Sequence, residues 1–381
     1  MRYSYNHIFN INLKDFQGML LRTVSKLSLL LITLISVACG QEEPRSGDIR
    51  TADLPEIVLN ERFILSDTPE SVIRQVNHVI TNADGEIFIS DWGAYKIHHF
   101  TQDGEFKTSI GGQGGAVGRF LLVQSLDFDE QNRMIVYDIR QNRHTVFDYI
   151  DDDWAAADTF SFSQPATGMT GYLSNGELLT STAFDERADD HLFQIYHHLQ
   201  KGTVDGSFLD EDPLRVRGRQ MMVDENTPPE EVPLSYRTLH SIGPDQNLYT
   251  LNTETFAVQT YDRNLTSVDT VYAPVAKLLI HESDRQNARL QISSSLRHLT
   301  DQYLPNTKPV ARSFITDEDG RFWIRTYDSP QYMVLDSEGS PLGSFDLPAG
   351  FQLHHVSGER LFASGTVARG DEVRVFEFSM P

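Results

Sequence analysis

Cysteine is almost absent from this sequence, since Cys39 is the only one among 381 residues. No disulfide can therefore form within the chain. Basic residues are also scarce, with 32 Lys and Arg against 54 Asp and Glu, and the formal net charge is −22. A surface of that sign repels phosphate backbones, which excludes nucleic acid as a partner.

Motifs of common enzyme classes are missing as well. The sequence contains no Gly-x-Ser-x-Gly and no His-Glu-x-x-His, so it shows neither a nucleophile elbow nor a zinc-protease helix. The glycine-rich stretch Gly111 to Gly118 is not followed by Lys-Ser or Lys-Thr, which a phosphate-binding loop requires. We interpret that stretch as a connection between structural repeats.

The N-terminus has the pattern of an export signal. A basic segment from Met19 to Lys26 precedes an apolar stretch, Leu27 to Ala38, which is too short to span a bilayer comfortably. Ser36-Val37-Ala38-Cys39 resembles a bacterial lipobox. We predict a signal peptide over 1–38, with Met19 as a possible start, and a lipidated flexible tether over 39–53. The lipid would hold the chain on a membrane, and the acidic residues after Cys39 favour the outer membrane, facing either side.

The rest of the chain repeats. A turn at Gly85 is followed by Glu86 to Phe100, and the same order of turn, apolar strand, acid, base and aromatic returns at Asn132 and at Gly320. Weaker copies follow turns at 176, 247 and 358. Each copy has the strand content of one propeller blade. We therefore predict an all-β fold over 54–381, a six-bladed β-propeller of four-stranded blades.

Two gaps between repeats are longer than a ~45-residue blade requires. The first, 209–233, contains Pro213, Pro228, Pro229 and Pro233, and we predict a surface loop there. The second, 276–308, predicts one amphipathic helix between blades 4 and 5, with Ser283 to Gln286 as its capping box and an apolar stripe of Ala288, Ile292, Leu296 and Leu299. That helix would pack on the rim, or serve as a lid or partner surface. The strand-like run 56–65 is expected to close the ring as the fourth strand of the last blade.

Two further patterns carry a family resemblance. Asp138-x-x-x-Asn142-Arg143-x-x-Val146-Phe147 resembles NHL-type repeats, and the segment from Leu304 to Arg325 is similar to six-bladed propeller lipoproteins of Bacteroidetes-like bacteria. The resemblance implies the propeller fold and a lipid anchor. It leaves activity open, because such propellers include lactonases, lyases, sensors and binding proteins.

A central site is expected on the innermost strand of each blade. Counting seven residues back from each turn predicts a ring of channel-lining residues: His78, Ser125, Met169, His240, Ser313, and Phe351 or Gln352. His78 and His240 are weak candidates for a metal site, because related six-bladed lyases and hydrolases bind metal at such positions. No third histidine or carboxylate matches them, so zinc or calcium is only a possible cofactor. Arg312 and His354 are expected at the funnel mouth, where they suit an anionic ligand.

From these residues we predict a lipid-anchored recognition propeller of the cell envelope, which binds a small molecule, peptide or protein. We assign no catalytic residue. One alternative is a metal-dependent hydrolase or lyase that uses His78 and His240. Another is an accessory subunit of an outer-membrane complex that uses the 276–308 helix.

Overall fold

The computed structural model describes residues 48–65, 72–209, 212–224, 227–243, 245–327, 331–368 and 370–381. Cys39 and the expected signal peptide lie outside the described residues, as do the side chains of Met169 and Thr170. Residues Gly47–Pro381 form one compact unit. No described helix is long and apolar enough to cross a membrane.

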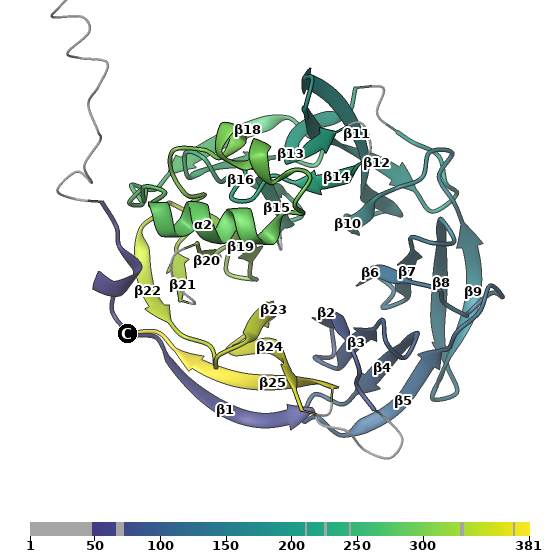
Figure 1. Ribbon diagram of the computed structural model, residues 1–381. Helices are drawn as coiled ribbons and strands as arrows, with labels where there is room; N and C mark the ends of the chain where they lie inside the picture. The colour runs from purple at the N-terminus through teal and green to yellow at the C-terminus, as the bar shows by residue number, and fades with distance from the viewer. Residues whose placement is uncertain are drawn as a thin grey trace, which may run out of the picture. The chain divides into compact units, whose positions relative to one another are not determined.

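Six antiparallel sheets follow one another around a centre bordered by β2, β6, β10, β15, β19 and β23 (Figure 1). The first blade contains β2 (Val76–Thr81), β3 (Ile87–Asp91), β4 (Lys96–Phe100) and β5 (Phe106–Gly111). The second contains β6 (Val123–Phe128), β7 (Met134–Asp138), β8 (Arg143–Ile150) and β9 (Asp153–Phe160). The third contains β10 (Gly168–Tyr172), β11 (Glu177–Asp189), β12 (Leu192–Thr203), β13 (Leu214–Asp224) and β14 (Thr227–Glu231).

The fourth blade contains β15 (Thr238–Ile242), β16 (Leu248–Asn252), β17 (Ala257–Tyr261) and β18 (Ser267–Tyr272). The fifth contains β19 (Ala311–Thr316), β20 (Phe322–Thr326), β21 (Tyr332–Leu335) and β22 (Pro341–Phe345). The sixth contains β23 (Phe351–Ser357), β24 (Arg360–Val367), β25 (Gly370–Ser379) and β1 (Val58–Leu65). β1 pairs with β25 and completes the sixth sheet. The predicted six-bladed propeller and its closure by the first strand are confirmed.

The segment predicted as a loop, 209–233, instead contains β13 and β14, so that the third blade has five strands. The prediction was wrong because local proline content conceals a long-range pairing. β11 and β12 form a long hairpin, and β12 offers an edge on which β13 pairs from Leu214 to Met222. Pro228 and Pro229 lie in β14, the outermost strand of that sheet, where a missing N–H costs least.

The helical insertion lies between blades 4 and 5 as predicted, but it is not one helix. It contains α2 (Glu282–Gln291), η2 (Arg297–Leu299) and α3 (Thr300–Tyr303). Ile292 has an extended backbone that ends α2, and the N-terminal capping box uses His281 and Asp284 rather than Ser283 and Gln286. The apolar stripe itself is buried, against Leu192, Met222 and Val232 of the third blade.

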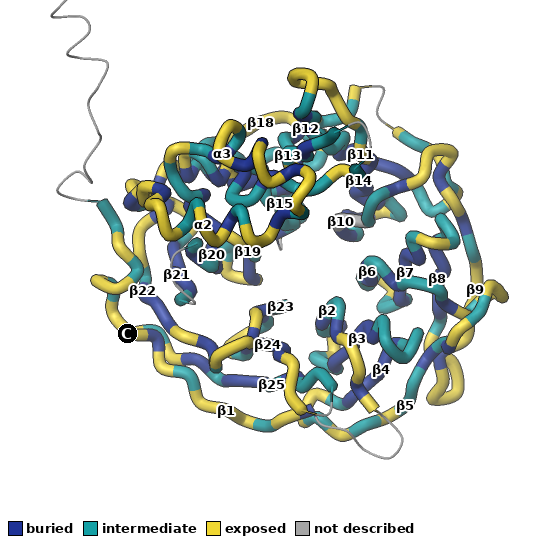
Figure 2. Tube along the Cα trace, viewed as in Figure 1, coloured by how far each residue is buried: buried dark blue, intermediate teal, exposed yellow. Residues whose placement is uncertain are grey.

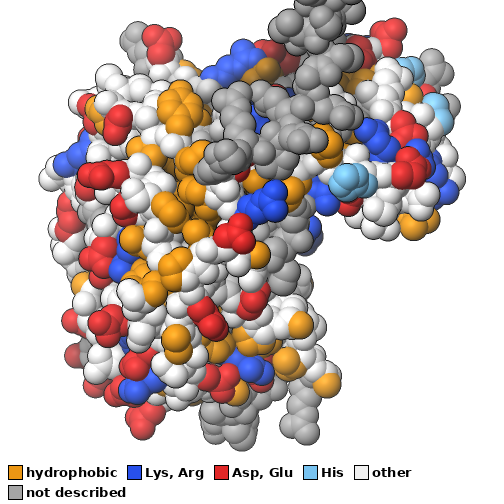
Figure 3. Space-filling model, turned by 90° about the vertical axis from the view of Figure 1, so that its left-hand side faces the viewer, with side chains coloured by type: hydrophobic (Ala, Val, Ile, Leu, Met, Phe, Trp, Pro, Cys, Tyr) orange, Lys and Arg blue, Asp and Glu red, His pale blue; other side chains and the backbone are white. Residues whose placement is uncertain are grey.

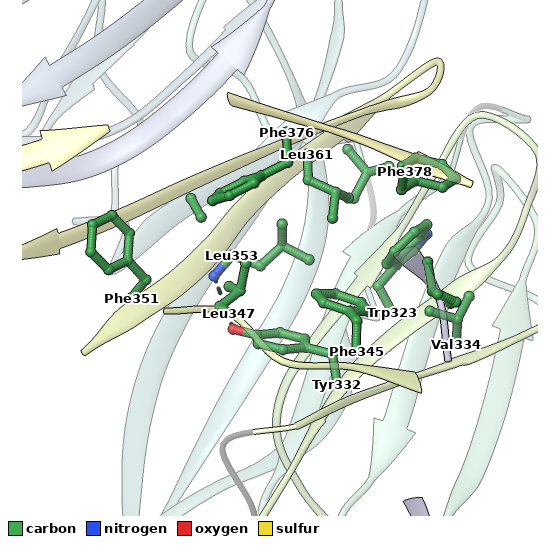
Figure 4. Close-up of a cluster of buried hydrophobic side chains, with 13 residues drawn as sticks. Trp323, Tyr332, Val334, Phe345, Leu347, Phe351, Leu353, Leu361, Phe376 and Phe378 are labelled. Atoms are coloured by element: carbon green, nitrogen blue, oxygen red, sulfur yellow. Dashed lines mark hydrogen bonds between the residues drawn. The ribbon is translucent and has the colours of Figure 1, made fainter. Parts of the chain in front are cut away.

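The core consists of apolar layers between neighbouring blades. Figure 2 shows buried chain along the middle strands and exposed chain along the outer strand β1. Between blades 5 and 6, Trp323 and Tyr332 face Phe351, Leu353 and their neighbours (Figure 4). The Tyr332 hydroxyl oxygen accepts a hydrogen bond from the Leu353 N–H at 2.9 Å, so this layer satisfies a buried backbone donor as well.

The described part of the expected tether, 39–53, is held against the propeller. Ile49 N–H donates to Pro274 O at 2.6 Å, and Ala276 N–H donates to Ile49 O at 3.1 Å. A short 3₁₀ helix, η1 (Thr51–Asp53), follows. Residues from Ile49 onward are thus fastened to the propeller, because their backbone groups find partners there.

Candidate functional site

The inner strands of all six blades begin at one face of the unit, here called the front face. Their first residues are Val76, Val123, Gly168, Thr238, Ala311 and Phe351. The connections between blades return to the same face, including the helical insertion between β18 and β19. At the front face, the insertion packs against the far ends of β11 and β12 and against β13 and β14, through a shared cluster of apolar side chains. We call this assembly of β11–β14 and the insertion the lobe; Figure 3 shows it projecting beside a hollow.

Strand register decides which inner-strand residues are equivalent. Each lies opposite the residue three positions after the first apolar residue of its second strand, which gives His78, Ser125, Gly168, Leu239, Ser313 and Gln352. Met169 and His240, predicted for blades 3 and 4, are each one residue away. In blade 3 a bulge falls between Met169 and Gly171. In blade 4 the residue with positive φ is Gln246 (61°) rather than Asn247, so the count started one residue too late.

The consequence is that His78 and His240 do not occupy matched positions. His240 has the register of Val79, and it lies three blades away from His78 around the ring. The described residues contain no group of three or more His, Cys, Asp or Glu side chains that could hold a metal ion. The two histidines therefore belong to no such group within the described chain.

Histidines of the first and last blades gather near the centre. Burial lowers the pKa of His78 to about 4, and the pKa of His354 to about 4 with a further contribution from His78. His354 Nε2 lies 2.7 Å from Ser364 Oγ, and His355 Nε2 lies 3.0 Å from Thr81 Oγ1. His78 Nδ1 is buried and has no hydrogen-bond partner among the described residues. These imidazoles are neutral at pH 7, so they can offer donors or acceptors to a ligand but no charge.

Burial also lowers the pKa of His240 to about 4, with a further contribution from His197 of β12. Burial has the opposite effect on the carboxyl group of Asp127 in β6, because it raises the pKa of that group to about 6. Its carboxylate accepts hydrogen bonds from the N–H groups of Tyr172 at 2.7 Å and Phe128 at 2.8 Å. Because the bond from Tyr172 joins the neighbouring inner strands β6 and β10, Asp127 has a structural task that accounts for its burial.

Among the Lys and Arg residues, Arg312 is nearest in the sequence to one of the six equivalent inner-strand residues, because it directly precedes Ser313. It is exposed, and it occupies a bulge in β19 between Ala311 and Ser313, a device that turns a side chain away from the regular strand direction. Its Cζ lies 4.4 Å from the centroid of the Tyr327 ring, and its Nη2 donates to Tyr327 O at 3.2 Å. No described carboxylate lies within ion-pair distance of this guanidinium.

Arg312 and Tyr327 border a hollow of about 510 Å³, here called the front hollow. Its other walls are Glu230 and Glu231 of β14, Pro233 and Leu234 after that strand, and Gln291 and Ile292 of the insertion. Both acids are already engaged. Glu231 pairs with Arg219 at 3.3 Å and Arg237 at 3.1 Å, and Glu230 accepts from Ser293 N–H at 3.0 Å. The front hollow therefore offers an anionic group one cation stacked on an aromatic ring, beside a Glu231 charge balanced by two arginines and a Glu230 charge that keeps its sign.

Sequence reasoning placed Arg312 at the mouth but missed the rest of the front hollow. Tyr327 was not among the predicted site residues, and Glu230 and Glu231 fell inside the segment predicted as a surface loop. The walls come from the third blade, the connection after it, the helical insertion and the fifth blade, so no local signal marks them.

Comparisons with known proteins agree on the fold. Residues 46–166 match the model of a family described as 6-bladed beta-propeller. No curated protein matches the chain. The structure is similar to that of a Bacteroides fragilis protein assigned as exported, with 12% identity and a TM-score of 0.51 over 88% of this chain and 97% of that one.

Two enzymes show a weaker likeness. A virginiamycin B lyase of Staphylococcus aureus has 11% identity and a TM-score of 0.45, over 84% of this chain and 99% of that one. A gluconolactonase of Xanthomonas campestris has 15% identity and a TM-score of 0.44, over 86% and 95%. Identities this low speak to fold alone, and function has to be argued from the site.

Proposed function

We propose that this chain is a lipid-anchored recognition propeller of the bacterial envelope, and that it binds an anionic small molecule or the carboxylate end of a peptide in the front hollow. The observation that carries the proposal is the Arg312–Tyr327 pair. A guanidinium that lies on an aromatic ring is already oriented, so less conformational entropy is lost when it binds a carboxylate.

The test is a titration calorimetry screen of the purified full chain against dicarboxylates, sugar acids and peptides with free C-termini. We expect at least one class to bind, and Arg312→Gln to weaken that binding at least ~10-fold, equivalent to about 1.4 kcal/mol. Arg263→Gln is the matched control, since Arg263 lies in the turn between β17 and β18, at the opposite end of blade 4. Equal binding by wild type and Arg312→Gln would contradict the proposal.

The anchor is proposed from Ser36-Val37-Ala38-Cys39. Growth of the producing bacterium with an alkyne-bearing fatty acid should label the wild-type chain and leave Cys39→Ser unlabelled. Protease added to intact cells would then distinguish a surface-facing chain, which is digested, from a periplasmic one. If the wild-type chain is unlabelled as well, the anchor is refuted, and the proposed ligand site is not affected by that result.

A further inference from the structure

The N-terminal segment leaves the propeller at a defined point on its rim. Besides the two hydrogen bonds that fasten Ile49, Ser344 N–H donates to Pro55 O at 2.8 Å, and Ile57 N–H donates to Ser344 O at 2.8 Å. The segment thus runs from the helical insertion along β22 before it becomes β1. The first described residue, Asp48, is nine positions after Cys39.

That spacing limits how far the rim can stand from a membrane. Nine residues reach at most about 30–32 Å when fully extended. If Cys39 carries lipid in a bilayer, Asp48, the residue before the point where Ile49 joins Pro274 and Ala276, must lie within that distance of the bilayer surface. The opposite rim, where β9 lies in Figure 1, is under no such limit.

Apolar side chains are exposed at this same point. Tyr272, at the end of β18, is 71% exposed, and Leu278 and Leu279 in the insertion are 41% and 43% exposed. Beside them lies a hollow of about 290 Å³ whose lining includes Ile49, Val275, Leu278 and Pro309. We call these residues the rim patch. Figure 3 shows hydrophobic side chains gathered on this side of the unit.

Cations accompany the rim patch although the chain is strongly acidic. Arg50 and Lys308 line the 290 Å³ hollow, where Lys308 Nζ is also paired with Asp284 Oδ1 at 3.0 Å, and Lys277 is exposed next to Leu278. Apolar side chains bordered by Lys and Arg are the combination that partitions into the boundary between lipid headgroups and acyl chains. A polar partner would gain little from burying Tyr272 and two leucines.

We propose that the rim patch is the membrane-contact face of the protein, and that it lies against the phospholipid bilayer into which Cys39 is anchored. The proposal rests on the lipid attachment proposed above. Contact with the bilayer fixes which side of the propeller faces the lipid, and so holds the front hollow at a constant position relative to the membrane. A lipid on a flexible tether alone would leave the propeller free to tumble.

The experiment uses the lipidated full chain reconstituted in phosphatidylethanolamine–phosphatidylglycerol vesicles. Tyr272→Cys and Leu279→Cys, each labelled with an environment-sensitive fluorophore, report on the rim patch. Ile150→Cys is the matched control, because Ile150 is 54% exposed at the end of β8 in the second blade. Cys39 itself does not react when its sulfur carries lipid. Lipids with nitroxide in the acyl chain serve as quenchers, and flotation measures attachment separately.

We expect blue-shifted emission and strong quenching at positions 272 and 279, and water-like emission without quenching at 150. Adding Leu278→Ser and Leu279→Ser should reduce the quenching at 272 while flotation stays complete. Vesicles that float with the protein but quench all three positions equally, or none, would overturn the contact face and leave the anchor intact. A chain that fails to float would overturn the anchor and the contact face together. Quenching at 272 lost only when a second protein is added would assign the patch to a protein partner instead.

Discussion

The Trp323 indole Nε1 donates a hydrogen bond to Asp317 Oδ2 at 2.7 Å, and both residues are almost fully buried. The same carboxylate closes the turn between β19 and β20, since it accepts from the N–H groups of Asp319 and Arg321 and from Arg321 Nε at 2.6 Å. In blade 2, Asp129 and Arg133 repeat the turn, with Nε and Oδ2 2.7 Å apart. There the place of Trp323 is taken by Ile135, which has no N–H to offer.

This difference makes the two aspartates a matched pair for mutagenesis. Asp317→Ala removes the turn bonds and also leaves the Trp323 N–H buried without an acceptor, whereas Asp129→Ala removes only the turn bonds. We expect Asp317→Ala to lower the free energy of unfolding by about 3–5 kcal/mol, and by about 1–3 kcal/mol more than Asp129→Ala. Urea denaturation followed by tryptophan fluorescence measures both. Equal losses would show that the indole bond adds nothing.

His144 should make stability depend on pH. Its ring is stacked between Tyr137 and Phe160, with centroids 4.5 Å away on each side, and neither ring nitrogen has a hydrogen-bond partner among the described residues. Burial lowers the pKa of His144 from 6.5 to about 3. The unfolded chain therefore takes up a proton before the folded one does. The contribution of this neutral ring is complete above pH 6.5 and is lost as the pH falls from 6.5 toward 3.

Replacing His144 by Phe should remove this pH dependence while keeping an aromatic ring in the stack. Between pH 7 and pH 5 the wild type should lose about 2 kcal/mol through His144 alone, and His144→Phe should lose that much less. Urea unfolding at both pH values gives the comparison. If the two proteins lose the same stability, the ring is not buried in neutral form.

The repeat in the sequence predicts the blades well because it is local. Turn residues such as Gly85 and Gly320 have positive φ, and the strands around them alternate in ways that a short window records. Closure by 56–65 was also predictable, because a three-stranded last blade leaves an edge that another strand must cover.

The site was harder to predict, and the reasons are particular. Leu239, not His240, aligns with His78, because a single turn residue moved the count by one and each shift of one turns a side chain to the other face. β13 and β14 depend on an edge supplied by β12, which proline-rich local sequence does not reveal. Tyr327 meets Arg312 at a bulge in β19, which the strand pattern of the sequence does not mark.

The lobe should lose its order when its apolar contacts are cut. Leu296 is fully buried with Leu192, Met222 and Val232, so Leu296→Ala removes contacts that join the insertion to the third blade. We expect a loss of about 2–5 kcal/mol, visible in hydrogen exchange as faster exchange of the amides of α2, α3, β13 and β14 with little change in blades 1 and 2. Leu290→Ala is the control, since Leu290 is 76% exposed on α2. Uniformly faster exchange in every blade would argue against the lobe as a separate cooperative element.

The last prediction concerns how Tyr327 acts on a bound anion. The Tyr327 ring stacks on Arg312, and its carbonyl oxygen accepts from Arg312 Nη2, so Tyr327 would contribute mainly by holding the guanidinium in place. For the ligand that emerges from the calorimetric screen, Tyr327→Ala should weaken binding by roughly threefold to tenfold, the size of one cation–π contact. The double variant Arg312→Gln/Tyr327→Ala should bind no more weakly than Arg312→Gln, because the ring then has no cation to position. Additive losses in this double-mutant cycle would instead mean that Tyr327 touches the ligand on its own. Tyr327→Phe separates the two roles further: it keeps the stacking surface and the backbone carbonyl, so affinity should stay near wild type unless the tyrosine hydroxyl itself reaches the anion.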